Sequence, residues 1–164
     1  MSSNDRMQLK NLKIGIFGKR SSGKSALINV LLGEDAAEVS ETKETTYKAM
    51  DIKGVGAVTI VDTVGLDAEK KRVTKTQTAA EEINIALMLI ANDSIELELA
   101  WMNRLTRSNI VVIPIVSQID KLPDQGKLLA AAIREASGKE PIRVSAKEMI
   151  GIDELREKII EAIK

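Results

Sequence analysis

The sequence contains no cysteine and no histidine, and it has only one residue each of Phe, Tyr and Trp. Without thiols or imidazoles, the chain has no disulfide, no thiolate nucleophile, no histidine base and no cysteine-bound zinc or iron–sulfur cluster. Aromatic residues make up 2% of the chain, so the stacked rings on which proteins hold single-stranded nucleic acid are also absent. Any chemistry must use hydroxyls, carboxylates, amines and the backbone.

Net charge and long apolar runs are also lacking. The 24 Lys and Arg residues balance 24 Asp and Glu residues, so no long-range field attracts nucleic acid or an anionic membrane. The two longest apolar runs, Ile85–Ala91 and Ile110–Val116, are far shorter than the roughly 20 residues that span a bilayer. The polar N-terminus has no secretory signal. We therefore expect a cytoplasmic protein without a membrane span.

The sequence contains enough hydrophobic residues to form the core of one compact domain, since they make up 44% of its 164 residues. Short apolar runs alternate with stretches of helical spacing, which is typical of an α/β fold. We expect a polar extension over residues 1–12 and one domain over residues 13–164. The expected strands are 13–18, 49–53, 57–62, 85–91, 110–117 and 142–144, and the expected helices are 24–32, 74–82, 96–107, 125–137 and 152–164.

These segments predict a three-layer α/β/α sandwich around a six-stranded, mostly parallel sheet. The sequence KGVG at residues 53–56 predicts a hairpin turn, and therefore one antiparallel pair at an edge of the sheet. Pro114 lacks an N–H group for the strand ladder, so we expect the strand around it to be irregular or short. Glu96 and Glu98 are expected to be exposed helix charges, and Trp101 is expected to pack in the core.

Residues 18–25 read GKRSSGKS and fit the phosphate-loop pattern G-x-x-x-x-G-K-S. In such a loop the glycines let backbone N–H groups surround a phosphate, the lysine neutralises the β and γ oxygens, and the hydroxyl binds Mg²⁺. An apolar run precedes the motif and a helical segment follows it, which is the context that the motif needs. The expected nucleotide-binding residues of this segment are Gly18, Ser21, Ser22, Gly23, Lys24, Ser25 and Ala26.

Two further segments carry candidate partners for a magnesium ion. Asp62 ends an apolar run, and Gly65 follows it three residues later. A carboxylate at this place can hold the Mg²⁺ shell opposite Ser25, and the Gly65 N–H can donate to a γ-phosphate. The hydroxyl of Thr45 or of Thr46 can close the same shell, and the sequence leaves that choice open.

The order of the motifs resembles that of the small GTPase domain of the translation-factor-like class. After the phosphate loop and Asp62 come Asp120, at the end of an apolar run, and then the triplet Ser145-Ala146-Lys147. A closer similarity is to the GTPase domain of HydF, the maturation GTPase of [FeFe]-hydrogenase, which is itself similar to the TrmE and Era GTPases. The segments that carry this similarity are YKAM at 47–50, VTIVDTVGLD at 58–67 and RVTKT at 72–76.

This resemblance implies a P-loop NTPase fold that binds GTP or GDP with Mg²⁺ and hydrolyses GTP to GDP. It implies switch loops that a protein partner reads, and it allows a homodimer. Catalytic roles fall on Lys24, Thr45 and Gly65, and magnesium binding falls on Ser25, Thr45 and Asp62. The residues implied to meet the base are Gln118, Asp120, Ser145, Ala146 and Lys147.

The base-recognition motif, N/T-K-x-D in the family, reads SQID at residues 117–120. Asp120 still accepts both guanine N1–H and N2–H₂, a pairing that adenine does not offer. Ser117 and Gln118 are expected to lose one hydrogen bond to the base and the packing of a lysine stem. At about 0.5–1.5 kcal/mol for each interaction, binding should weaken by roughly ten- to a hundredfold.

Two other departures concern hydrolysis. Ser21 stands where related families bind a potassium ion through an asparagine, so K⁺ is a candidate cofactor that this substitution argues against. Leu66 stands where some GTPases carry a water-orienting glutamine, and a leucine cannot polarise water. We therefore expect slow intrinsic hydrolysis.

Two other functions compete with a GTPase switch. A P-loop kinase that transfers the γ-phosphoryl group to a small acceptor would share the phosphate loop, but it leaves Gly65 and the triplet 145–147 unexplained. A nucleotide-responsive or nucleotide-dead interaction module, with relaxed guanine specificity, is supported by the altered base motif. Relative affinities for GTP, ATP and XTP separate the three functions.

Overall fold

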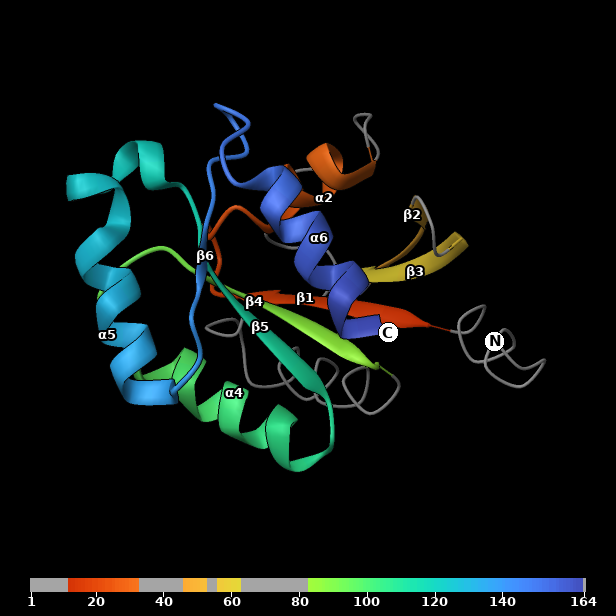
Figure 1. Ribbon diagram of the computed structural model, residues 1–164, viewed down its shortest axis with the longest axis horizontal. Coiled ribbons are helices and arrows are strands. Elements are labelled where there is room, and N and C mark those ends of the chain that lie inside the picture. The colour runs from red at the N-terminus through yellow and green to blue at the C-terminus, as the bar shows by residue number, and fades with distance from the viewer. Residues whose placement is uncertain (1–11, 33–45, 53–55, 63–82, 164) are drawn as a thin grey trace.

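A computed structural model describes residues 12–32, 46–52, 56–62 and 83–163 of the chain (Figure 1). The predicted helix 74–82 lies outside these residues. The elements along the chain are β1 (Lys13–Gly18), α2 (Lys24–Leu32), β2 (Thr46–Ile52), β3 (Gly56–Asp62), β4 (Ile85–Ile90), α4 (Glu96–Arg107), β5 (Val111–Val116), η1 (Ile119–Lys121), η2 (Pro123–Gly126), α5 (Lys127–Ser137), β6 (Ile142–Arg143) and α6 (Ile152–Ile163).

The strands form one six-stranded sheet in the order β2-β3-β1-β4-β5-β6. β2 pairs with β3 in antiparallel register from Thr46 opposite Asp62 to Ile52 opposite Gly56. The other neighbouring strands pair in parallel. The prediction of a mostly parallel sheet with one antiparallel edge pair is confirmed.

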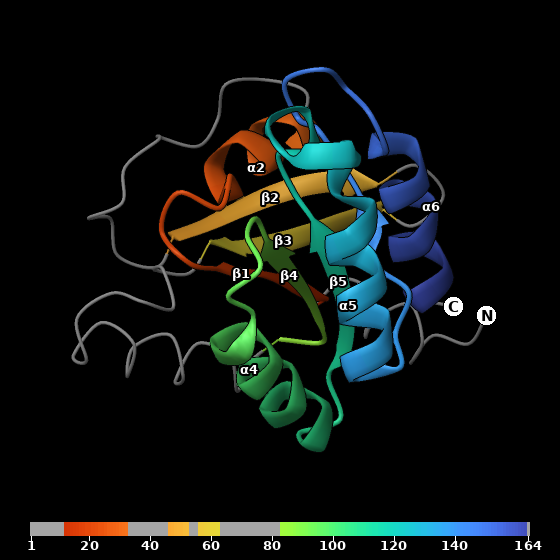
Figure 2. The same ribbon diagram turned by 90° about the vertical axis from the view of Figure 1, so that its left-hand side faces the viewer.

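Helices cover both faces of this sheet, as Figures 1 and 2 show. Alternate residues of each inner strand face opposite layers. In β1, Ile14 and Ile16 pack with α2 and α6, whereas Phe17 packs with α4 and α5. β4 is buried along its whole length because it has a strand on either side and a helix layer on each face. The three-layer α/β/α arrangement is confirmed.

β5 is regular through Pro114, so the prediction of an irregular or short strand there is wrong. Its register with β4 runs without interruption from Val111 to Val116. The Val116 carbonyl accepts from Val144 on the β6 side. Because alternate residues of a parallel strand point their backbone groups to the same side, Pro114 also faces β6. β6 pairs only with Ile115 and Val116, so no ladder bond is lost at the proline.

The two largest shifts of a predicted boundary are at the starts of β2 and α5. β2 begins at Thr46 instead of Ala49 because its pairing with β3 extends to Asp62. α5 begins at Lys127 instead of Gln125 because Asp124 and Gln125 have φ angles of 50° and 51°, outside the helical region. Among the described residues, no helix has both the length and the apolar character that a membrane span requires.

Candidate functional site

The phosphate-loop motif joins β1 to α2, at the carboxyl end of a central strand. The Lys24 ammonium donates to two carbonyl oxygens of the same loop, those of Gly18 and Lys19, each at 3.2 Å. The Ser22 N–H donates to the Lys19 carbonyl at 3.2 Å and closes a turn. Lys24 therefore reaches back across the loop, so its positive charge lies where the loop's N–H groups can surround a phosphate.

Two glycines give the loop its close fit. A Cβ atom at Gly18 would lie 2.5 Å from Ser22 Oγ and 3.0 Å from the Leu89 carbonyl oxygen. Gly23 has a φ of 93°, a backbone conformation that favours glycine.

The backbone of Ser21 is also left-handed. Its φ is 65°, a conformation that asparagine tolerates better than serine. The backbone at position 21 therefore suits asparagine, the residue that the family resemblance leads us to expect there.

The base-recognition loop is fastened directly to the phosphate loop. The Ser117 hydroxyl donates to the Ser22 carbonyl at 2.6 Å, and the contact is buried. The next residue, Gln118, is left-handed with a φ of 55°, and a Cβ at Gly23 would lie 3.3 Å from its Nε2 atom. Ser117 therefore uses its hydroxyl to hold the two loops together, and the Gln118 side chain lies against the phosphate loop.

A second tether holds Asp120. The Ser145 hydroxyl donates to Asp120 Oδ1 at 2.8 Å and accepts from the Glu148 N–H at 3.0 Å. The Ser145 backbone is paired in both directions with Ile150. Ser145 is fully buried whereas Asp120 is exposed. The buried serine thus fixes one carboxylate oxygen of Asp120, and the other remains available to a ligand.

These two loops enclose a pocket of about 110 Å³ with the first turn of α2. The structure brings six of the predicted nucleotide-binding residues into its lining. The full lining is Gly23, Ala26, Leu27, Ser117, Gln118, Asp120, Lys121, Val144, Ala146 and Lys147. Gly18, Ser21, Ser22, Lys24 and Ser25 belong to the adjoining phosphate loop and helix start. Charge, backbone N–H groups and an exposed carboxylate therefore meet in one place, and this donor set fits a purine nucleotide.

The predicted magnesium ligands are placed by the sheet. Ser25 lies in the first turn of α2, and Asp62 is the last residue of β3, in register with Ile16 of β1. Thr46 begins β2 opposite Asp62. Thr45 and Gly65 lie outside the described residues. Magnesium binds through few protein oxygens, of the hydroxyl and carboxylate types, together with phosphate and water. The backbone places Asp62 beside the carboxyl end of β1, from which the phosphate loop leads to Ser25.

Sequence reasoning missed a buried acid beside the loop. Glu98 is 1% exposed, and its Oε1 lies 3.3 Å from the ammonium of Lys19, so the prediction that it is solvated is wrong. Its spacing from Trp101, Met102 and Leu105 places it on the buried face of α4. That helical spacing is visible in the sequence and was the available signal.

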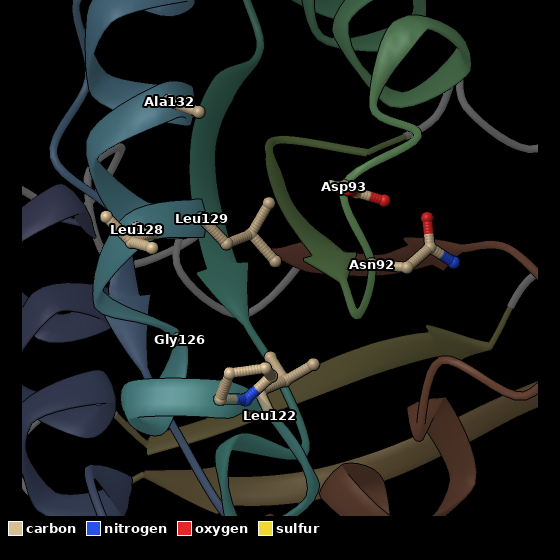
Figure 3. Close-up of a pocket in the computed structure, with 8 residues that line it drawn as sticks. Asn92, Asp93, Leu122, Gly126, Leu128, Leu129 and Ala132 are labelled. Carbon is tan, nitrogen blue, oxygen red and sulfur yellow. The ribbon is translucent and has the colours of Figure 1, made fainter.

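A second pocket, of about 400 Å³, is lined by residues that follow β4 and by residues of η2 and α5 (Figure 3). One wall comes from the turn after β4, with Asn92 and Asp93, and the facing wall from α5, where Leu129 points toward these residues and Leu128 lies at the exposed edge. Leu122, Pro123, Gly126 and Ala132 complete the lining. Its lining carries one charged residue, Asp93, whereas the lining of the pocket at the phosphate loop carries Asp120, Lys121 and Lys147.

The fold and the site together define a P-loop nucleotide-binding protein, and comparison with known proteins identifies the class. The sequence model of the family described as 50S ribosome-binding GTPase matches residues 13–118. The tRNA modification GTPase MnmE of Chromobacterium violaceum is 31% identical over 163 residues, which cover 94% of this chain and 35% of that protein. GTPase Der of Sulfurihydrogenibium sp. is 30% identical over 167 residues, covering 91% and 38%.

Solved structures agree on the fold. Era from Aquifex aeolicus, bound to GDP and AlF₄⁻, aligns with a TM-score of 0.78 at 24% identity over 93% of this chain and 56% of that chain. The G domain of the T. maritima FeoB iron transporter aligns with a TM-score of 0.72 at 20% identity, over 93% of this chain and 99% of that one.

The chain belongs to the 50S ribosome-binding GTPase family. It is a GTP-binding P-loop domain of the TrmE/Era-like class, for which GTP, GDP and Mg²⁺ are the expected ligands. Its relatives are GTPases, which supports GTP hydrolysis in general terms. The chain spans little more than a third of the length of the MnmE and Der proteins that it matches.

Proposed function

We propose that the protein is a GTP-dependent switch with slow, Mg²⁺-dependent GTP hydrolysis, and that residues 13–164 form one G domain. The observation that carries this proposal is the pocket in which the phosphate loop meets Asp120, held by Ser145. A carboxylate fixed in this way is suited to the two adjacent N–H donors of guanine. A site that bound only phosphates would have no need of it.

Each end of the site has its own role. The backbone N–H groups of the phosphate loop and the Lys24 ammonium bind the β- and γ-phosphates. Ser25 and Asp62 hold Mg²⁺, with Thr45 as the switch threonine that completes the shell. Gly65 senses the γ-phosphate through its N–H. When bound, Mg²⁺ neutralises charge on the phosphate oxygens, and catalysis depends on positioning and electrostatics.

Three residues beside Asp120 complete the base end. Ala146 offers its backbone N–H to the guanine edge, Lys147 lies at the rim, and Gln118 flanks the base from the phosphate-loop side. These roles are supported by the position of the three residues, which line the same pocket as Asp120. Together they make guanine the preferred base.

Slow hydrolysis and weak dependence on potassium follow from two residues. Leu66 cannot orient water, and Ser21 has no amide oxygen for a potassium ion. We expect equal turnover in K⁺ and Na⁺, measured by phosphate release. In Ser21→Asn, which also relieves the left-handed serine, turnover should become faster in K⁺ than in Na⁺. A strong preference of the wild-type protein for K⁺ would contradict this assignment of Ser21.

A finer role is that of the GTPase module of a hydrogenase-maturation protein of the HydF type. It is supported by the segments at residues 47–50, 58–67 and 72–76. The absence of cysteine means that this chain does not itself hold a cysteine-bound cluster, so its part is either regulatory or shared with other polypeptide. It acts through its switch loops on a protein partner or a second copy.

A second candidate function is a nucleotide-responsive module with relaxed guanine specificity. It is favoured by the commitment of the Ser117 hydroxyl to the Ser22 carbonyl, which leaves one fewer donor for the base. The relevant difference between the two functions is therefore discrimination between bases.

Titration calorimetry with GTP, ATP and XTP in the presence of Mg²⁺ tests both. Tightest binding of GTP, followed by release of phosphate, supports the switch. Equal binding of GTP and XTP favours the relaxed module. A preference for ATP, or no binding at millimolar nucleotide, overturns the proposed GTPase function.

A further inference from the structure

The two lysines of the phosphate loop are used in opposite ways. Lys24 turns back onto the loop's own carbonyl oxygens. Lys19 turns away and donates to the Ser94 carbonyl at 2.5 Å. It also forms an ion pair with Glu98, with 3.3 Å between Nζ and Oε1. Its ammonium therefore links the loop to the start of α4.

The acid at the other end of this link is buried. The Glu98 side chain is 2% exposed and the Lys19 side chain 20% exposed. Glu98 shares the inner face of α4 with Trp101, Met102 and Leu105. A carboxylate in such surroundings is costly without a countercharge. Burial of the Glu98 carboxylate therefore favours the one orientation of Lys19 that keeps the ion pair.

The backbone of Lys19 carries that orientation to the phosphate-binding part of the loop. Its carbonyl accepts both the Lys24 ammonium and the Ser22 N–H, each at 3.2 Å. The residue that Glu98 holds by its side chain is therefore the same residue on which Lys24 rests. Motion of Lys19 would move the acceptor that positions Lys24.

We propose that Glu98 is a positioning residue for the nucleotide site, acting through Lys19 to hold the phosphate loop in its binding geometry. Lys19 is a tether to α4 and not a phosphate ligand. This inference rests on the proposed function, because it assumes that the loop binds nucleotide. It also means that a partner that displaces the start of α4 would weaken nucleotide binding.

The decisive variant is Glu98→Gln, which keeps the shape of the side chain and removes its charge. Glu96→Gln is the matched control, since Glu96 is an exposed acid in the same first turn of α4. We expect Glu98→Gln to raise the Kd for a fluorescent GDP analogue with Mg²⁺ by roughly tenfold, a typical coupling for one charged contact. Glu96→Gln should leave the Kd unchanged, and Lys19→Arg should stay within about twofold of wild type because it keeps the charge.

Lys19→Met alone leaves a buried charge unpaired and can prevent folding, so it is made together with Glu98→Gln. If the two residues act as one unit, the double variant binds about as weakly as Glu98→Gln. A double variant that binds much more weakly than Glu98→Gln would overturn the tether, because Lys19 would then act on the nucleotide independently of Glu98. So would a Glu98→Gln protein that melts at a lower temperature but keeps the wild-type Kd, since the acid would then be merely structural.

Hydrogen exchange of the nucleotide-free protein gives a readout that does not need GDP. Peptides covering residues 18–25 should exchange faster in Glu98→Gln than in wild type or Glu96→Gln, whereas peptides from β5 should not change. Wild-type protein that binds no GDP would refute the proposed function, and the exchange data would still decide this inference. Unchanged exchange in the loop overturns it.

Discussion

The phosphate end and the base end of the nucleotide site are shaped by different groups. At the phosphate end, residues 18–25 keep the family pattern, and the loop is shaped by glycines and by backbone acceptors for Lys24. At the base end, Ser117 and Gln118 depart from the family pattern, and within residues 117–120 only Asp120 retains the family side chain. Both ends nevertheless meet in one pocket.

The difference shows which kind of site tolerates substitution. A phosphate cradle depends on backbone direction, so its glycines and its lysine have few replacements. The base end depends on where the loop is held, and Ser117 and Ser145 hold it through hydroxyls. The position of the base-recognition loop can thus be maintained by side chains, such as that of Ser117, that need not contact the ligand.

The largest effect is expected at the phosphate end, from Lys24→Ala. The change removes the ammonium that meets the phosphates, and charge-assisted hydrogen bonds contribute about 1.5–3 kcal/mol each. GTP affinity measured by calorimetry should fall by about 100-fold or more. The fold should persist, as judged by circular dichroism. Unchanged affinity would show that the phosphate loop is not a binding site.

At the base end, Asp120→Asn should lower GDP affinity by roughly 30-fold, because an amide replaces the carboxylate that accepts the two guanine donors. The same variant should gain affinity for XDP, whose base offers an acceptor at the altered position. Competition between the two nucleotides for a fluorescent analogue measures both. If GDP binding fell without any gain for XDP, Asp120 would be acting on the loop and not on the base.

A smaller effect is expected from Ser117→Ala, which tests the tether between the two ends. The Ser22 carbonyl would remain buried without its donor, at a cost of about 1–3 kcal/mol in the free energy of unfolding. Thermal unfolding should occur a few degrees lower. Ser117→Thr, which keeps the hydroxyl, is the control. Equal stability of the alanine variant would mean that the bond contributes nothing net.

The smallest expected effect is that of Gln118→Lys. A lysine stem would pack a longer apolar surface beneath the base than glutamine does, so GDP affinity should rise by about two- to fivefold. Dissociation of a fluorescent GDP analogue should slow by a similar factor. A fall in affinity would indicate that the amide of Gln118 itself contacts the nucleotide.

Much of the fold was predictable because the spacing of apolar residues within short segments indicates which of them form strands and which form helices. β1, α2 and α4 were predicted with the bounds that the structure has, since each combines a clear period with a motif or charge boundary. Two expectations failed. The helical spacing of Glu98 already placed it on the buried face of α4, but the partner of its charge is distant in the sequence, as is the strand beside Pro114. Pro114 is tolerated because β6 is too short to reach it, and Glu98 is buried because Lys19 lies across from it.

The sequence by itself determined the phosphate loop, the order of its supporting motifs and the alternation of strands and helices. Those features depend on residues close together in the chain, whose spacing sets the backbone. Only the tertiary structure decided how the ends of the site are joined. Ser117 and Ser22 are 95 positions apart, and Lys19 and Ser94 are 75 apart. No local period encodes such contacts, which exist only once the parallel sheet has brought its strand ends together.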